Sequence, residues 1–130
     1  MKYMLTLIGE EGGWEDVTPE EMRAQMGRWD EFTQATRDAG AFIAGEGLQD
    51  SPTATTIRIQ DDDERVVTDG PFAETKEQIG GFYLLECENL DEALEWAKKV
   101  PLRGGAIEVR PVMDYEAYGS EQHAAAEARS

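Results

Sequence analysis

Two amphipathic helix patterns, each lying between strand patterns, constrain what this chain can fold into. The first starts at Thr18, which forms a Thr-x-x-Glu capping box with Glu21 and precedes a proline at the first helical position. Gly40 is typical of the residue just beyond a helix C-terminus. Between them, apolar residues recur every three or four positions and predict one core-facing stripe: Met22, Met26, Trp29, Phe32, Ala35 and Ala39.

The second helix is predicted over residues 90–99, with Asn89 as its N-cap. Acidic residues stand in its first turn and lysines in its last, so each carries the charge that the helix dipole favours. Its predicted buried stripe consists of Leu90, Ala93, Leu94 and Ala97.

Strand patterns fill the rest of the chain. They cover residues 2–8, 41–49, 54–60, 64–68, 81–88 and 105–112, and the third and fourth form a hairpin across three aspartates. Without the hairpin the order is βαββαβ, which predicts an α+β, ferredoxin-like fold with an inserted β-hairpin. The domain is expected over residues 1–113, followed by a partly helical or disordered tail at 114–130.

The strands carry apolar residues on both faces, whereas two helices can cover only one face of a sheet. In the first strand, for example, Tyr3 and Leu5 alternate with Met4 and Ile8. The uncovered apolar face predicts a homodimer that closes sheet against sheet.

The composition limits the partners and the compartment. Twelve basic and 28 acidic side chains give a net charge of −16, which disfavours direct binding to nucleic acids or anionic membranes. No apolar run approaches the roughly 20 residues of a membrane helix, and no signal peptide is evident. A single cysteine excludes an internal disulfide, which allows a reducing compartment but does not identify one. The cytoplasm is therefore the default expectation.

Asp69 is the candidate acid or base. It opens a turn, Asp69-Gly70-Pro71-Phe72, and two interpretations stay open. In the structural one, Asp69 bonds amides of its own turn and Phe72 fills the core. In the functional one, Asp69 ends a strand beside a cavity and acts as a carboxylate base.

Charged residues within apolar strands are the candidate ligand-binding set: Glu46, Arg58, Glu108 and Arg110, with Tyr83 as the nearby phenol. They surround a polar ligand, form cross-strand ion pairs or are exposed at the sheet edge. Tyr83 either bonds the ligand or packs in the core.

Other chemistry lacks the residues it needs. Cys87 has no basic neighbour that would activate its thiol, and we expect it to be a buried strand residue. One histidine, one cysteine and carboxylates without ligand spacing predict no metal site and no bound cofactor.

Three segments together carry a family resemblance: residues 69–77 (DGPFAETKE), 80–83 (GGFY) and 107–111 (IEVRP). The chain resembles the DGPF-domain branch of the YCII-related family, a bacterial family largely without an assigned reaction. The resemblance implies a dimeric α+β barrel of ferredoxin-like protomers and a connection to extracytoplasmic-function sigma factors. Some YCII-like proteins are thought to use a histidine–aspartate pair. Because His123 stands in the tail, we do not carry that pair over.

We therefore expect a small dimeric binding protein with a small-molecule or partner site in the cleft between the two sheets. The alternative is a cofactor-independent enzyme, similar to an isomerase or a monooxygenase. In that case Asp69 handles the proton, and Arg58 or Arg110 holds an anionic group of a small organic substrate.

Overall fold

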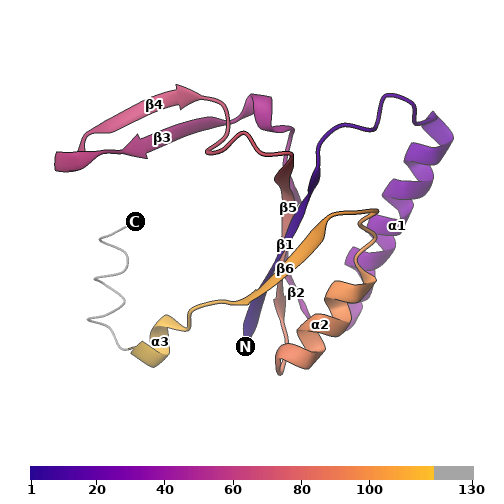
Figure 1. Cartoon of the computed structure of the whole chain (residues 1–130). Coiled ribbons are helices and arrows are strands. Elements are labelled where there is room, and N and C mark those ends of the chain that lie inside the picture. Colours follow the sequence, from indigo (N-terminus) through magenta and orange to yellow (C-terminus); the bar gives the residue numbers. More distant parts are fainter. Residues whose placement is uncertain (119–130) are drawn as a thin grey trace.

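A four-stranded antiparallel sheet is the centre of the molecule, and the computed structural model describes residues 1–118 (Figure 1). Its strand order is β2–β5–β1–β6, and helices α1 and α2 lie on one face. The bounds are β1 Lys2–Glu10, α1 Pro19–Asp38, β2 Phe42–Gly47, β5 Glu77–Glu86, α2 Leu90–Lys99 and β6 Ala106–Pro111. The predicted α+β, ferredoxin-like fold is confirmed.

Both helix starts follow from local sequence. The Thr18 side chain accepts a hydrogen bond from the Glu21 amide at 3.1 Å, and Asn89 accepts one from the Glu92 amide at 3.0 Å. These caps satisfy amides that have no partner inside the helix.

The core lies between the helices and the facing side of the sheet. Phe32 of α1 occupies its centre, where its ring meets Tyr83 edge-on at 5.1 Å and Trp96 at 6.1 Å between ring centroids. The buried cluster comprises Tyr3, Leu5, Leu7, Phe32, Tyr83, Leu85, Cys87, Ala93, Ala97 and Val100.

The predicted stripe of α1 is wrong in part. Met26, Ala35 and Ala39 are exposed, whereas Gln25 and Thr36 are buried beside Phe32. Burial of these polar side chains is tolerated because each is hydrogen-bonded, to the Pro101 carbonyl at 2.8 Å and the Thr33 carbonyl at 2.7 Å.

The predicted stripe of α2 is also only partly correct. Ala93 and Ala97 are buried, but Leu90 and Leu94 are exposed. Val100, just beyond the helix, is buried with the two alanines. The buried side of α2 is therefore narrower than the sequence pattern indicates.

Two bulges determine which face each strand residue occupies. Gly80 is the extra residue where Leu7 pairs with Gly81 and Ile8 with Ile79. Ile43 is the extra residue where β2 pairs with β5. Strand β5 also begins four residues earlier than expected, at Glu77.

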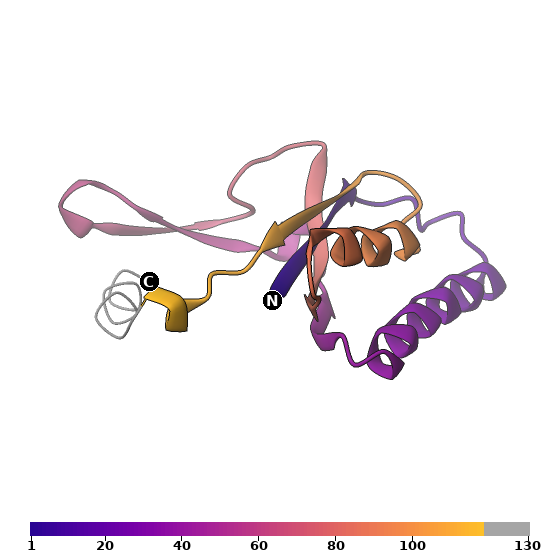
Figure 2. The ribbon, with the colours of Figure 1, turned by 90° about the horizontal axis from the view of Figure 1, so that it is seen from below.

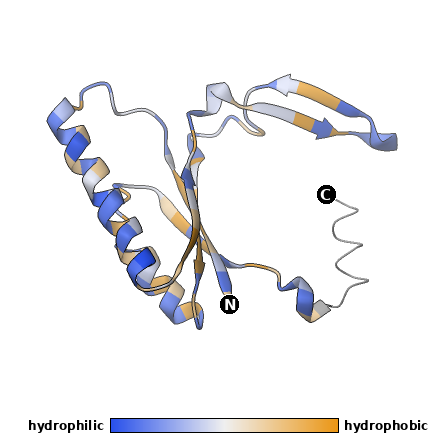
Figure 3. Cartoon of the chain, turned by 180° about the vertical axis from the view of Figure 1, so that it is seen from behind, coloured by the Kyte–Doolittle hydropathy of each residue, from blue (hydrophilic) through white to orange (hydrophobic). Residues whose placement is uncertain are grey.

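The sheet face away from the helices, here called the open face, carries apolar residues at its centre, as predicted, and charged residues around them. Its apolar residues are Met4, Ile8, Ala44, Ile79, Phe82, Leu84 and Ala106, and its polar and charged residues are Lys2, Thr6, Glu10, Glu46, Glu77, Glu86, Glu108 and Arg110. Figure 3 shows apolar residues along the sheet and along the hairpin.

The hairpin is a separate two-stranded sheet, β3 Thr55–Ile59 and β4 Arg65–Asp69, here called the arm. A short 3₁₀ turn, η1 Ser51–Thr53, precedes it, and another, η2 Asp61–Asp63, forms its tip. Figures 1 and 2 show that the arm extends from the sheet on the side opposite the helices. Helix α3 Tyr115–Tyr118 lies on that side as well.

Two sequence predictions concern the C-terminal tail and membrane spans. Residues 119–130 of the predicted tail, with His123, lie outside the described residues. In residues 1–118, none of the helices has the length and apolar character that crossing a membrane requires.

Candidate functional site

A cavity of about 550 Å³ lies between α1 and the sheet, and we call it the α1 cavity. Its volume is within the range of roughly 300–1,000 Å³ of small-molecule sites. Its lining includes Leu7, Trp29, Thr33, Arg37, Phe42, Gly45, Gly47, Gln78 and Tyr83.

The floor of the cavity is hollow because it carries glycines. Gly45 pairs with Tyr83 and Gly47 with Gly81, so both face α1. A β-carbon on Gly45 would stand 2.8 Å from Cδ1 of Tyr83, so only glycine fits beneath that ring. A β-carbon on Gly47 would meet nothing within 4 Å, which identifies the open space above it.

Helix α1 supplies one wall through three residues at four-residue spacing, Trp29, Thr33 and Arg37. The Trp29 ring lies parallel to that of Tyr83, with an interplanar angle of 3° and centroids 6.4 Å apart. The Thr33 and Tyr83 hydroxyls are hydrogen-bonded at 2.8 Å.

The third of these residues brings a positive charge. The guanidinium carbon of Arg37 lies 4.2 Å from the centroid of the Phe42 ring. The cavity therefore combines aromatic walls, a hydroxyl pair and a guanidinium group.

Loops close the mouth of the cavity. Glu11, after β1, accepts hydrogen bonds from the amide and the hydroxyl of Ser51, so the loop after β1 is tied to the turn after β2. Trp14 lies in the same mouth and also lines a second hollow of about 670 Å³, which adjoins the first at Trp29.

Tyr83 and Glu46 are the predicted site residues that the structure places at the α1 cavity. Tyr83 presents its ring and hydroxyl there, and it also packs in the core, as the other interpretation expected. Glu46 pairs with Phe82, whose side chain lies on the open face, so Glu46 contributes backbone to the cavity.

Glu108 and Arg110 lie on the open face instead. The carboxylate of Glu108 and the guanidinium of Arg110 form an ion pair at 2.6 Å. The two residues pair with each other within β6, so this is not the cross-strand ion pair that the sequence left open as the alternative to a ligand site.

Arg58 and Asp69 belong to the arm. Arg58 donates a hydrogen bond to the Phe72 carbonyl at 2.8 Å and lies over the Phe72 ring. Asp69 is exposed at the end of β4 and lines neither of the two cavities. The idea that Phe72 fills the core is wrong, because its side chain is 74% exposed. The structure thus does not bring the six candidate residues together.

Trp29, Thr33, Arg37 and Gly47 line the cavity without having been site candidates. The spacing of the three α1 residues was visible in the sequence, as were the alternate glycines of the second strand. What the sequence lacked was the register that places Gly47 opposite α1.

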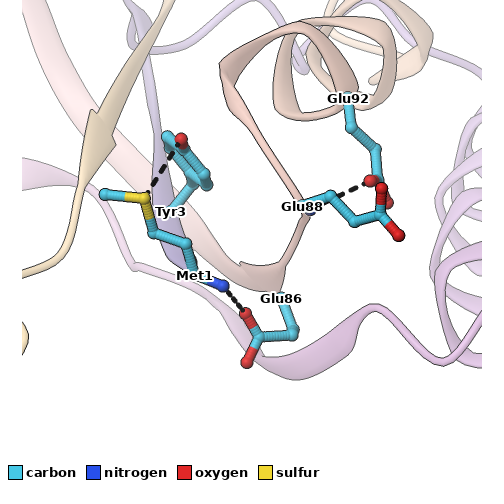
Figure 4. A network of polar contacts seen from close by, with 5 residues as sticks. All are labelled: Met1, Tyr3, Glu86, Glu88 and Glu92. Carbon is cyan, nitrogen blue, oxygen red and sulfur yellow. Dashed lines mark hydrogen bonds and ion pairs between the residues drawn. The ribbon is translucent and has the colours of Figure 1, made fainter.

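Cys87 is buried, as predicted, one residue beyond the end of β5. Figure 4 shows the polar contacts of the glutamates that neighbour it in sequence, Glu86, Glu88 and Glu92. Glu86 pairs with the N-terminal ammonium, and Glu92 accepts a hydrogen bond from the Glu88 amide at 2.9 Å. Burial, and then the carboxylates of Glu92 and Glu86, raise the pKa of the Cys87 thiol. A protonated, buried thiol is a poor nucleophile.

Within residues 1–118, His, Cys, Asp and Glu side chains form no group that could hold a metal ion.

Comparison with known proteins gives two findings. The model of the YCII-related domain matches residues 1–116. An uncharacterised protein of Rhizobium meliloti (strain 1021) is 46% identical over 82 residues, which is 61% of this chain. The chain spans 65% of that relative's length.

Proposed function

The chain belongs to the YCII-related domain family, and we propose that it binds a small organic molecule in the α1 cavity. The observation that carries the proposal is the glycine floor beneath an aromatic and hydroxyl-bearing wall. A packed core would fill this space, since cavities cost stability unless something occupies them.

The lining defines the chemistry of the ligand. Trp29, Tyr83 and Leu7 offer flat apolar surface for an aromatic or alicyclic body. The Thr33–Tyr83 hydroxyl pair offers a hydrogen bond to one polar group. Arg37 lies four residues beyond Thr33 on the same wall and favours a polar group with negative charge.

The remaining expectations complete the proposal. We propose a homodimer in which two open faces meet, with a second contact region for a ligand or partner in the cleft between the sheets. Cytoplasmic location belongs to the same proposal and rests on the sequence patterns described above. The DGPF branch and an association with sigma factors also belong to it and rest on the resemblance.

The test is a fragment screen by amide NMR on the full chain, using a library of several hundred small organic molecules. Pockets that bind natural ligands also bind fragments at high rates. We expect hits that shift the amide signals of Thr33, Gly45 and Gly47. A screen without hits, or hits that cluster elsewhere on the molecule, would overturn the proposal.

The enzyme alternative stays a separate prediction. Asp69 is exposed outside the α1 cavity, so ligand binding there does not depend on it. Once a ligand is known, turnover that disappears in Asp69→Asn while binding persists would support the enzyme alternative.

A further inference from the structure

The arm exposes an apolar surface that the described residues leave uncovered. Its strands make their main contacts with each other, and an isolated two-stranded hairpin is marginally stable in water. Yet one side of it carries Ile57, Ile59 and Val67, which are 59%, 63% and 64% exposed. We call these three residues the arm face.

The register shows that the arm face is a single surface. Ile57 pairs with Val67, so their side chains lie on the same side, and Ile59 follows two residues after Ile57. The other side of the hairpin carries Arg58, whose guanidinium is held by the Phe72 carbonyl. Among residues 1–118, none covers the arm face.

Opposite charges flank the arm face. Arg65 pairs with Ile59 near the tip of the hairpin, and Asp69 pairs with Thr55 at its base. Both share the side of Val67, because they stand two residues to either side of it on β4. A separation of four residues along the strand places their Cα atoms about 13 Å apart. Neither side chain forms an ion pair with any residue between 1 and 118.

This arrangement complements itself. A two-fold axis that lies between two packed arm faces and runs perpendicular to their strands reverses the strand direction, so the tip of one arm meets the base of the other. Arg65 then faces Asp69 of the partner subunit, and the reciprocal pair forms at the opposite end. A surface with a single sign of charge could not pair with its own copy in this way.

We propose that the arm face packs against the arm face of a second copy of this chain, closed at both ends by Arg65–Asp69 pairs. The inference rests on the homodimer of the proposed function and adds a contact between the arms to the contact between the sheets. The arm and the open face lie on the same side of the molecule, so one partner is placed to meet both (Figures 1 and 2).

The test is a charge swap followed by sedimentation of the full chain. Arg65→Asp and Asp69→Arg each place like charges together at both ends and should weaken the dimer at least tenfold. The double variant Arg65→Asp/Asp69→Arg restores opposite charges and should recover dimerisation. The single variants change the net charge in opposite directions, so a general charge effect cannot weaken the dimer in both.

Matched controls carry the same substitutions on the exposed side of α1: Arg23→Asp and Asp30→Arg. Both should dimerise as the wild type does. Ile57→Thr/Val67→Thr keeps β-branched side chains but removes apolar surface, so it should weaken the dimer while circular dichroism stays unchanged.

The remaining outcomes separate the claims. If the single charge variants dimerise normally, or the double variant is as weak as they are, the arm contact is overturned. If the arm variants dimerise normally and Ile79→Lys on the open face breaks the dimer, the homodimer stands without the arm contact. A monomeric wild type would overturn both the homodimer and the arm contact. The proposal that the α1 cavity binds a small molecule would still be decided separately, by the fragment screen.

Discussion

The hydroxyl groups of Thr33 and Tyr83 lie 2.8 Å apart, 50 residues distant in sequence, and join α1 to β5 at the edge of the α1 cavity. The bond fixes the Tyr83 ring over Gly45 and beside Trp29. The same hydroxyls that stabilise the fold thereby become polar groups available to a ligand.

Tyr83→Phe removes this bond and leaves the Thr33 hydroxyl without it. We expect the free energy of unfolding to fall by about 0.5–1.5 kcal/mol. Thr33→Val should cost a similar amount, and the double variant should cost less than the sum of the two, because both remove the same interaction. Urea unfolding measures all four proteins, and strictly additive losses would contradict the assignment.

Gly45→Ala and Gly47→Ala form a matched pair, because the two glycines stand two residues apart on the same face of β2. The new methyl group at 45 meets the Tyr83 ring and should destabilise the protein by about 1–3 kcal/mol. At 47 it enters open space, and alanine should stabilise the strand by about 0.5–1 kcal/mol. Equal effects of the two substitutions on the urea midpoint would contradict the placement of Gly45 against the Tyr83 ring and of Gly47 beneath open space.

The order of the elements could be predicted from sequence because its signals are local. Thr18, Asn89 and Gly40 act through caps and turns within a few residues. The buried face of α1 was harder to predict, since Met22, Trp29 and Phe32 fit two stripes. One continues through Met26 and Ala35, as predicted, and the other through Gln25 and Thr36, as observed. What decides between them is a distant acceptor, the Pro101 carbonyl that binds Gln25.

The site was less predictable because strand register is not local. The bulge at Ile43 places Glu46 on the side of Phe82, and no pattern within β2 announces it. Tyr83 could be found as a phenol in an apolar strand. Arg37 stands outside the predicted apolar stripe of its helix, and its place in the site depends on Phe42, whose ring lies beneath its guanidinium.

Stability should fall at alkaline pH through Cys87. Its pKa is raised by burial and by nearby carboxylates, whereas the thiol of the unfolded chain titrates near 8.5. Below that pH both states keep the proton. Above it the unfolded chain releases its proton first, so the free energy of unfolding falls until the folded thiol also ionises.

Urea unfolding at about pH 7.5 and about pH 9.5 checks this sign. Cys87→Ala is the control, because it lacks the titrating group and should lose less stability over the same interval. An equal loss in both proteins would assign the alkaline effect to other groups.

Sedimentation of the wild-type chain tests the homodimer. We expect a species of twice 14.5 kDa at micromolar concentration, because the open face and the arm face both expose apolar surface. A sedimentation profile with only a 14.5 kDa species would contradict it.

The most direct test of the central claim is a titration of the strongest fragment hit into the wild type and into Gly47→Leu. The leucine side chain points into the α1 cavity from an unstrained backbone position, so it should fill the cavity without unfolding the protein. We predict that affinity falls at least about tenfold while the urea midpoint does not decrease. Unchanged affinity in Gly47→Leu would show that the ligand binds elsewhere.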